Sequence, residues 1–156
     1  MDKTLAAELV IAVLVILLAL MVLSWNLRKR RQKGLPSLEP VPEGIEPVQF
    51  EGLYLSTTPS GEPLNRVAVR GLGFRERGSV GVAAEGLVIL GDKFIPAATI
   101  HSVGRASWTI DRAVEPEGLS VVSWTLGETE LDSYFRLADP EGFLVAVSRF
   151  TKAGKK

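Results

Sequence analysis

The sequence contains no cysteine and only one histidine. Without cysteine, the chain forms no disulfide, binds no metal through thiolates and carries out no cysteine catalysis. His101 has no nucleophile or orienting partner beside it in the sequence, which favours a structural or surface role over a catalytic one. Gly71 and Gly73 are followed by Phe74, not by the Gly-Lys-Ser/Thr of a phosphate-binding loop, and Gly-x-Ser-x-Gly is missing. The sequence therefore predicts no enzyme, no metal site and no cofactor.

An excess of charge of one sign is also missing, because 18 basic and 18 acidic residues cancel. The balance hides an asymmetry between the two parts of the chain. From Gly34 onward there are 12 basic and 16 acidic residues, a net charge of −4. Neutralising the phosphates of a nucleic acid needs a concentrated basic face, so we expect no nucleic-acid partner.

One long apolar run is present near the N-terminus. Leu9–Leu23 contains no polar residue, and residues 5–25 are interrupted only by Glu8 and Ser24. About 20 helical residues span roughly 30 Å, the thickness of a bilayer's hydrocarbon core. We predict a transmembrane signal anchor in residues 1–27 that contacts the bilayer through residues 5–25, with Trp25 at the interface. The leucines expected to face lipid include Leu9, Leu14, Leu18 and Leu23.

A cleaved signal peptide is the alternative interpretation of this run. Lys3 is offset by Asp2, so the positive N-terminal region typical of such peptides is almost missing, and no small-x-small cleavage site lies between Leu20 and Asn26. The run is instead followed by five basic residues, which are Arg28, Lys29, Arg30, Arg31 and Lys33. The positive-inside rule then predicts a single-pass plasma-membrane protein with its N-terminus outside and its C-terminal domain in the cytoplasm.

The same basic cluster has two interpretations. It can simply fix the orientation of the helix, which is sufficient to explain it. It can also recruit anionic lipids, at about 1 kcal/mol per charge near the membrane surface. We favour the first interpretation and keep anionic lipid as a second partner class.

The segment after the cluster is rich in proline. Gly34–Val48 contains four prolines, which bias a chain towards extended conformations. We therefore expect residues 28–48 to form a basic flank and a semi-stiff spacer that sets the domain up to about 45 Å from the membrane. Residues 49–152 then form the folded domain, and residues 153–156 a basic tail.

The folded part reads as about seven short strands followed by one helix. Eight segments are candidates for these strands, at 50–56, 67–74, 79–83, 86–90, 93–96, 101–110, 119–126 and 130–137, and the second of them reads as a strand or as a strand with a bend. Turns are expected at 58–63 and at Gly91-Asp92, and one helical turn at 96–100. Asp139 is a good N-cap and Pro140 fits the first helical position. Phe143, Val147 and Phe150 then recur at helical spacing, which predicts an amphipathic helix over 139–151.

This order of elements resembles a bacterial pleckstrin-homology-like (PH-like) domain. The resemblance rests on 86–89 (Gly-Leu-Val-Ile), on 94–100 (Phe-Ile-Pro-Ala-Ala-Thr-Ile), and on the long strand and C-terminal helix that follow. The chain is similar to short actinobacterial membrane proteins that carry such a domain after one span. The resemblance implies a mainly β fold, a partly open seven-stranded barrel capped by the helix, and a binding scaffold rather than an enzyme. Lipid-binding members use several basic residues in the first hairpin loop, whereas residues 57–66 here hold Arg66, Glu62 and no lysine.

Two groups of charged residues are candidate sites. Four arginines gather in one quarter of the domain and could bind an acidic peptide or a lipid headgroup (Arg66, Arg70, Arg75 and Arg77). Strand alternation would split them between two faces, so a solvated strand is the competing interpretation. Glu128, Glu130 and Asp132 share one face and could bind a hard cation, although a solvated sheet face is favoured. Trp108 and Trp124 are expected in the core.

These observations give three function hypotheses, of which a small enzyme or metal-binding domain is the least favoured. The first is a membrane-tethered, non-enzymatic interaction module that binds a protein partner of unknown identity at the cytoplasmic face. The second is a peripheral sensor of anionic lipids that uses the Arg66–Arg77 cluster.

Overall fold

The computed structural model describes residues 3–32, 34–68, 70–106, 108–109, 112–113 and 118–153. The chain divides into two units, residues 1–34 and residues 35–156. In the first unit, α1 (Lys3–Gln32) is one continuous helix. Its segment Thr4–Leu27 is long and apolar enough to cross a membrane, and none of it is buried. Thr4–Leu27 has 24 residues, which corresponds to about 36 Å.

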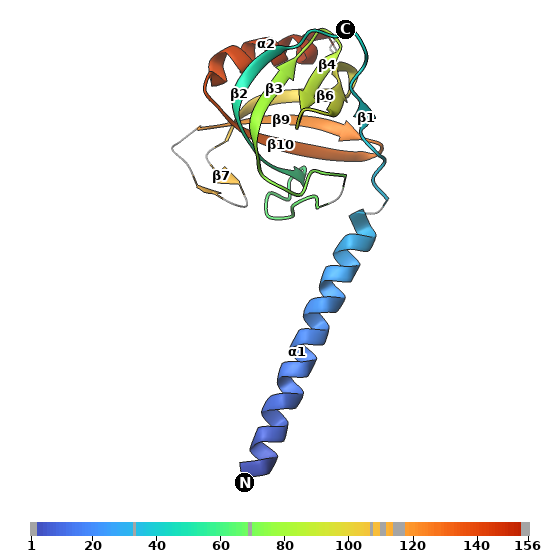
Figure 1. Ribbon diagram of the computed structural model, residues 1–156, viewed down its shortest axis with the longest axis vertical. Coiled ribbons are helices and arrows are strands. Elements are labelled where there is room, and N and C mark those ends of the chain that lie inside the picture. The colour runs from blue at the N-terminus through green and yellow to red at the C-terminus, as the bar shows by residue number, and fades with distance from the viewer. Residues whose placement is uncertain are drawn as a thin grey trace. The chain divides into compact units, whose positions relative to one another are not determined.

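The second unit is one curled antiparallel sheet with a helix across one end (Figure 1). The order in the sheet is β1-β5-β4-β3-β2-β10-β9-β6, and β1 and β6 do not pair, so the sheet is not closed. The strands are β1 (Glu39–Pro40), β2 (Val48–Pro59), β3 (Glu76–Val82), β4 (Gly86–Ile89), β5 (Lys93–Pro96), β6 (Ile100–Ala106), β9 (Leu119–Leu126) and β10 (Thr129–Leu137). A 3-10 turn, η1 (Ala97–Thr99), joins β5 to β6. A separate hairpin consists of β7 (Trp108–Thr109) and β8 (Arg112–Ala113).

The long strand β2 joins the two halves of the sheet. Its first part pairs with β3 from Val48 to Tyr54, and its last part pairs with β10 from Gly52 to Pro59. The register with β10 shifts at Leu55, where a bulge adds curvature. The mainly β fold with a partly open barrel and a C-terminal helix is therefore confirmed. Seven strands form the barrel, and the short strand β1 adds an eighth at the edge.

The helix α2 (Pro140–Ala153) closes one end of the barrel as its periodicity predicts. Phe143 and Val147 are fully buried and Phe150 nearly so. The Asp139 carboxylate accepts a hydrogen bond from the Gly142 backbone N–H at 3.0 Å, so Asp139 caps the helix as expected. Phe143 also contacts Phe50 and Phe135 edge-on or tilted, with ring centroids 5.5 and 5.8 Å apart.

Three local predictions are wrong. Residues 67–74 form no strand where the structure describes them, because Val67 and Leu72 point into the core from a loop rather than alternating along a ladder. Gly78 does not interrupt a strand but lies inside β3. The described residues of the strand expected over 101–110 also belong to two pairings, because β6 pairs with β9 and β7 pairs with β8.

The proline-rich segment is not a free spacer as the sequence suggested. Leu35 is buried in the core, Leu38 packs against it, and Glu39–Pro40 pair with β5. The reason is that apolar residues between the prolines bury against the sheet, which outweighs the extended bias of the segment.

Candidate functional site

The loop between β2 and β3, residues 60–75, lies at the end of the barrel opposite to α2 (Figure 1). Two of its apolar residues, Val67 and Leu72, are buried at 1% and 0% exposure. The Val67 N–H donates to the Thr57 carbonyl at 2.8 Å, which fixes the loop to the last part of β2. Burying two large aliphatic side chains stabilises this loop by about 3–6 kcal/mol on area grounds. The loop is therefore part of the core and not a loose hairpin tip.

A buried chain of hydrogen bonds lies beneath this loop. The Tyr54 hydroxyl donates to the Leu72 carbonyl at 2.9 Å and lies 2.8 Å from Thr57 Oγ1. Thr57 Oγ1 lies 2.7 Å from Ser133 Oγ, which accepts a hydrogen bond from Trp124 Nε1 at 2.9 Å. Trp124 is 1% exposed, so its predicted place in the core is confirmed. Burial raises the pKa of Tyr54 to about 12, so the group stays a neutral hydrogen-bond donor at physiological pH.

The four candidate arginines do not form a single patch. Arg66 Nη1 donates to the Gly73 carbonyl at 3.3 Å. Arg70 donates through Nε and Nη2 to the Leu35 carbonyl at 3.1 and 2.9 Å, and its own φ of 60° lies in the left-handed region. Arg75 and Arg77 are exposed, and Arg77 projects from β3. Two of the four guanidinium groups therefore hold the loop together, and two face solvent.

Two large apolar side chains of the same loop are exposed. Leu64 is 66% exposed and Phe74 is 80% exposed, beside the cationic Arg75. Exposed large apolar residues close to a cation are typical of a surface that contacts a membrane interface or a partner.

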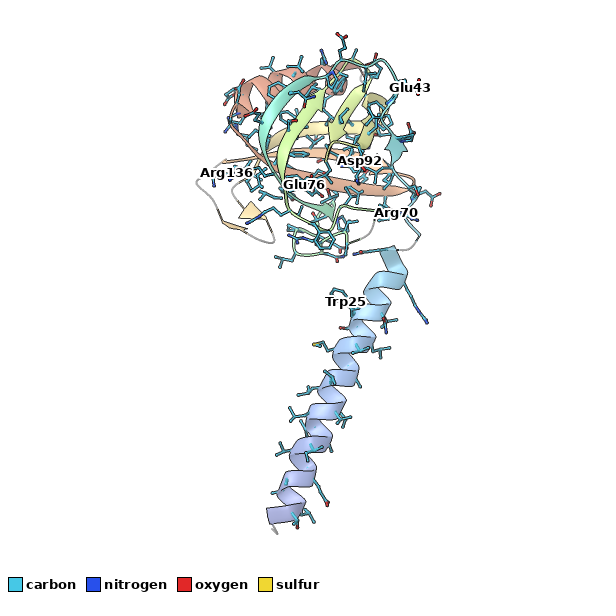
Figure 2. All side chains as sticks on the ribbon, in the orientation of Figure 1. Trp25, Glu43, Arg70, Glu76, Asp92 and Arg136 are labelled. Atoms are coloured by element: carbon cyan, nitrogen blue, oxygen red, sulfur yellow. The ribbon has the colours of Figure 1, made fainter. Side chains whose placement is uncertain are left out.

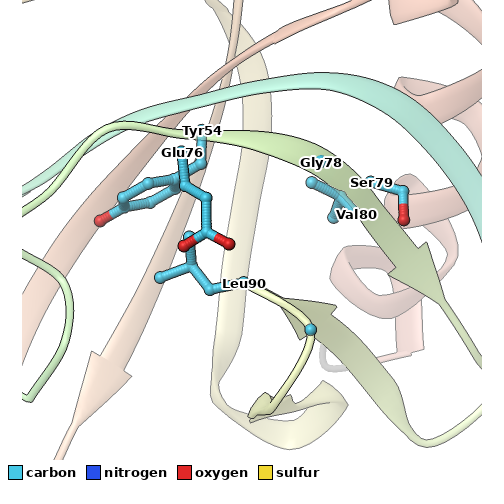
Figure 3. Close-up of a pocket in the computed structure, with 7 residues that line it drawn as sticks. Tyr54, Glu76, Gly78, Ser79, Val80 and Leu90 are labelled. Carbon is cyan, nitrogen blue, oxygen red and sulfur yellow. The ribbon is translucent and has the colours of Figure 1, made fainter.

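A cleft opens in the wall of the barrel where β3 and β4 diverge (Figure 3). These strands pair only at Gly81–Val88 and Val82–Leu87, so the earlier part of β3 has no neighbour on that side within the described chain. We call the opening the side cleft. It has a volume of about 250 Å³ and is lined by Tyr54, Glu76, Gly78, Ser79, Val80, Leu90 and Gly91.

The side cleft offers recognition chemistry rather than catalysis. Figure 3 shows the Glu76 carboxylate beside Leu90, while the Tyr54 hydroxyl points away into the buried hydrogen-bond chain. Leu90 has a φ of 53°, an uncommon conformation for a residue other than glycine, and the following Gly91 has a φ of 75°. One carboxylate in an otherwise mainly apolar cleft can orient a ligand, but it supplies no nucleophile with a base.

The remaining predicted candidates have ordinary structural surroundings. His101 is exposed, and its Nε2 forms a hydrogen bond with Thr125 Oγ1. Asp132 accepts hydrogen bonds from Ser123 Oγ at 2.6 Å and from Ser60 Oγ at 3.2 Å. Within the described residues, no group of three or more His, Cys, Asp or Glu side chains could hold a metal ion.

Several predicted features lie outside the described residues. They are Lys33 and the last three residues of the basic tail, together with the side chains of Arg28, Lys29, Arg31 and Trp108. In α1, the proposed lipid-facing leucines and Trp25 are all 53–60% exposed.

Sequence reasoning missed two contributions to these surfaces. The first is Leu90, which the sequence predicts only as the end of the strand over 86–90. No sequence signal indicates that it lines a cleft. Arg136 is exposed on β10 and lies level with Leu53 of β2 (Figure 2). The alternation of β10 could have indicated this, since Phe135 is buried and its neighbour Arg136 must face outward.

Comparison with family models matches residues 32–148 to a family described as bacterial PH domain-like. The match covers all strands of the sheet and most of α2. Neither the curated proteins nor the solved structures include a match.

Proposed function

The chain belongs to the bacterial PH domain-like family, and on this basis we propose that it is a membrane-tethered, non-enzymatic module that binds a protein partner at the cytoplasmic face. Domains of this fold serve as protein or lipid interaction modules and are generally not enzymes. The family indicates the class of activity, while the choice of partner rests on this chain's own residues.

The tether is supported by the properties of α1. A helix of this length that is apolar on all sides and unburied has no stable place in water. The basic residues 28–33 follow it directly, so we propose that residues 1–27 span the plasma membrane with the N-terminus outside.

The short reach of the connection supports a site of action at the membrane. The first core residue, Leu35, lies only eight residues after Leu27, the last apolar residue of the span. Eight residues reach at most about 29 Å even when fully extended. We therefore propose that the domain begins at residue 35 and acts within a few nanometres of the bilayer.

The observation that carries the choice of a protein partner is the use of Arg66 and Arg70 inside the loop. Each guanidinium donates to a backbone carbonyl, so these two side chains are committed to the fold. Both groups keep their charge, but the donors that hold the loop together are no longer available to an anionic headgroup. The side cleft, which has a mainly apolar lining and one carboxylate, suits a peptide side chain better than a phosphate.

Filling the side cleft tests this proposal. A Cβ added to Gly78 would meet no atom within 4 Å, so Gly78→Leu can occupy the cleft without backbone strain. We expect photo-crosslinking from Glu76 in native membranes to give a discrete protein adduct that Gly78→Leu abolishes. The control is Gly104→Leu, the same change at a strand glycine outside the cleft, where an added Cβ would meet only a Val121 methyl group at 3.9 Å. An adduct unchanged by Gly78→Leu would contradict the proposal.

The topology is tested with single cysteines, because the natural chain has none. Cysteines at Thr4 and Val145, both exposed, should differ towards a membrane-impermeant maleimide: Thr4→Cys should react in intact cells, and Val145→Cys only after the membrane is permeabilised. Labelling of Val145→Cys from outside would overturn the orientation.

A second candidate function, contact with anionic lipid, is favoured by the exposed Leu64 and Phe74 beside Arg75. An environment-sensitive dye on Phe74→Cys would then report an apolar medium in bilayers that contain anionic lipid, whereas the same dye on Val145→Cys would report water. If both positions remain in water, lipid contact by this loop is excluded.

A further inference from the structure

The outer face of the sheet carries two arginines in one row. Arg77 of β3 pairs with Leu53 of β2, and Leu53 pairs on its other side with Arg136 of β10. Side chains paired across a sheet project from the same face, so Leu53 lies between the two arginines. The Cα atoms of Arg77 and Arg136 are two strand spacings apart, roughly 10 Å.

This row is the centre of an open groove, which we call the outer groove. It has a volume of about 750 Å³, and its lining includes Glu51, Leu53, Arg77, Ser79, Arg136 and Ala138. The outer groove lies on the opposite face of β2 from Tyr54 and the barrel core. It differs from the loop arginines, since Arg70 and Arg136 lie on opposite sides of the domain in Figure 2.

Both arginines of the outer groove are exposed. Neither Arg77 nor Arg136 makes a hydrogen bond or an ion pair with any described residue. By contrast, Arg105 pairs with Glu141, and Arg149 donates to the Ala83 carbonyl at 2.9 Å. Among the described residues of the lining, Glu51 is the only acidic one, so these residues contribute a local charge of +1 within a domain of net charge −4.

We propose that the outer groove binds an acidic, extended segment of a protein partner, with carboxylates on Arg77 and Arg136 and apolar atoms over Leu53. Carboxylates two residues apart on an extended strand share one face and lie about 7 Å apart, which two arginine side chains can span. This inference rests on the proposed function as a protein-binding module and adds the chemistry of the partner.

Charge favours a local acidic segment over a membrane surface. A bilayer meets the whole face of a domain, and the field of every charge within a Debye length of about 8–10 Å contributes. The negative net charge of this domain opposes such contact. A peptide segment meets only the groove, where the balance is positive.

The test uses the full chain in nanodiscs of phosphatidylcholine and a fluorescent peptide of alternating glutamate and threonine. We expect saturable binding that weakens about tenfold in Arg77→Gln and in Arg136→Gln, and further in the double variant. Arg75→Gln is the matched control, because it removes the same charge from an exposed residue outside the groove. A peptide with glutamine in place of glutamate should not bind, and high salt should weaken binding of the acidic peptide.

Three outcomes would overturn the inference. The first is an acidic peptide that does not bind, or that Arg75→Gln weakens as much as the groove variants. The second is groove variants, held in phosphatidylcholine nanodiscs, that no longer bind added vesicles containing phosphatidylglycerol but keep the peptide, which would assign the arginines to lipid. The third is self-association lost in the groove variants, which would make a second copy the occupant. If the adduct from the side cleft persists while the groove fails, the proposed function survives and only this site is wrong.

Discussion

At the scale of single residues, the loop 60–75 separates buried from exposed leucines within a few positions. Leu72 is 0% exposed in the core, and Leu64 of the same loop is 66% exposed. We expect Leu72→Ala to lower the free energy of unfolding by about 2–5 kcal/mol, because it leaves a cavity under the loop. Leu64→Ala, the same chemical change, should stay within about 0.5 kcal/mol of the natural chain. Urea unfolding of the full chain in detergent measures both, and equal effects would contradict the placement of the loop.

Tyr54 gives the domain a pH dependence whose sign follows from its burial. The folded-state pKa is about 12 against 10 in the unfolded chain, so the neutral hydroxyl is favoured by folding. This contribution is fully present below pH 10 and is lost as the pH rises towards 12, on the order of 2–3 kcal/mol in total. Tyr54→Phe should therefore lose less stability over that range. Burial also raises the pKa of Tyr134, but Tyr134 is present in both the natural chain and Tyr54→Phe, so its effect on stability cancels in the comparison.

At the scale of elements, what could be predicted depended on how local the signal is. The helix α2 was predictable because Asp139, Pro140 and the apolar spacing act within one segment. Strand β9 matched its prediction to the residue because Gly118 and Gly127 bound it and its second half, from Val122 to Thr125, alternates regularly. The strand predicted over 67–74 was wrong because Val67 and Leu72 are buried against residues that are distant in the sequence. A short apolar run does not distinguish a strand from a loop that packs into the core. The outer groove could not be predicted, because it depends on the register among β3, β2 and β10, and the sequence of one strand does not specify that register.

The pairing of β2 with β3 places two glycines opposite each other with very different surroundings. A Cβ on Gly52 would lie 2.2 Å from the Arg136 carbonyl oxygen, whereas one on Gly78 would meet nothing within 4 Å. We expect Gly52→Ala to force β2 and β10 apart and destabilise the domain by more than about 1 kcal/mol. Gly78→Ala should be neutral or stabilise by up to about 1 kcal/mol, since glycine is unfavourable inside a strand. Thermal unfolding of the two variants compares them directly, and a cost at Gly78 equal to that at Gly52 would contradict the register.

At the scale of the whole molecule, the boundary between tether and domain decides which truncated chain folds. Residues 35–48 supply Leu35 to the core, the carbonyl that Arg70 binds, and the edge strand β1. A chain that begins at residue 34 should therefore unfold cooperatively in the absence of detergent, because it keeps the core and lacks the apolar helix. A chain that begins at residue 49, where the sequence alone places the domain, should lose at least 2–5 kcal/mol, the cost typical of removing one buried leucine. Urea unfolding followed by circular dichroism compares the two chains. If they were equally stable, the proline-rich segment would be a spacer after all, and the close approach of the domain to the membrane would no longer follow.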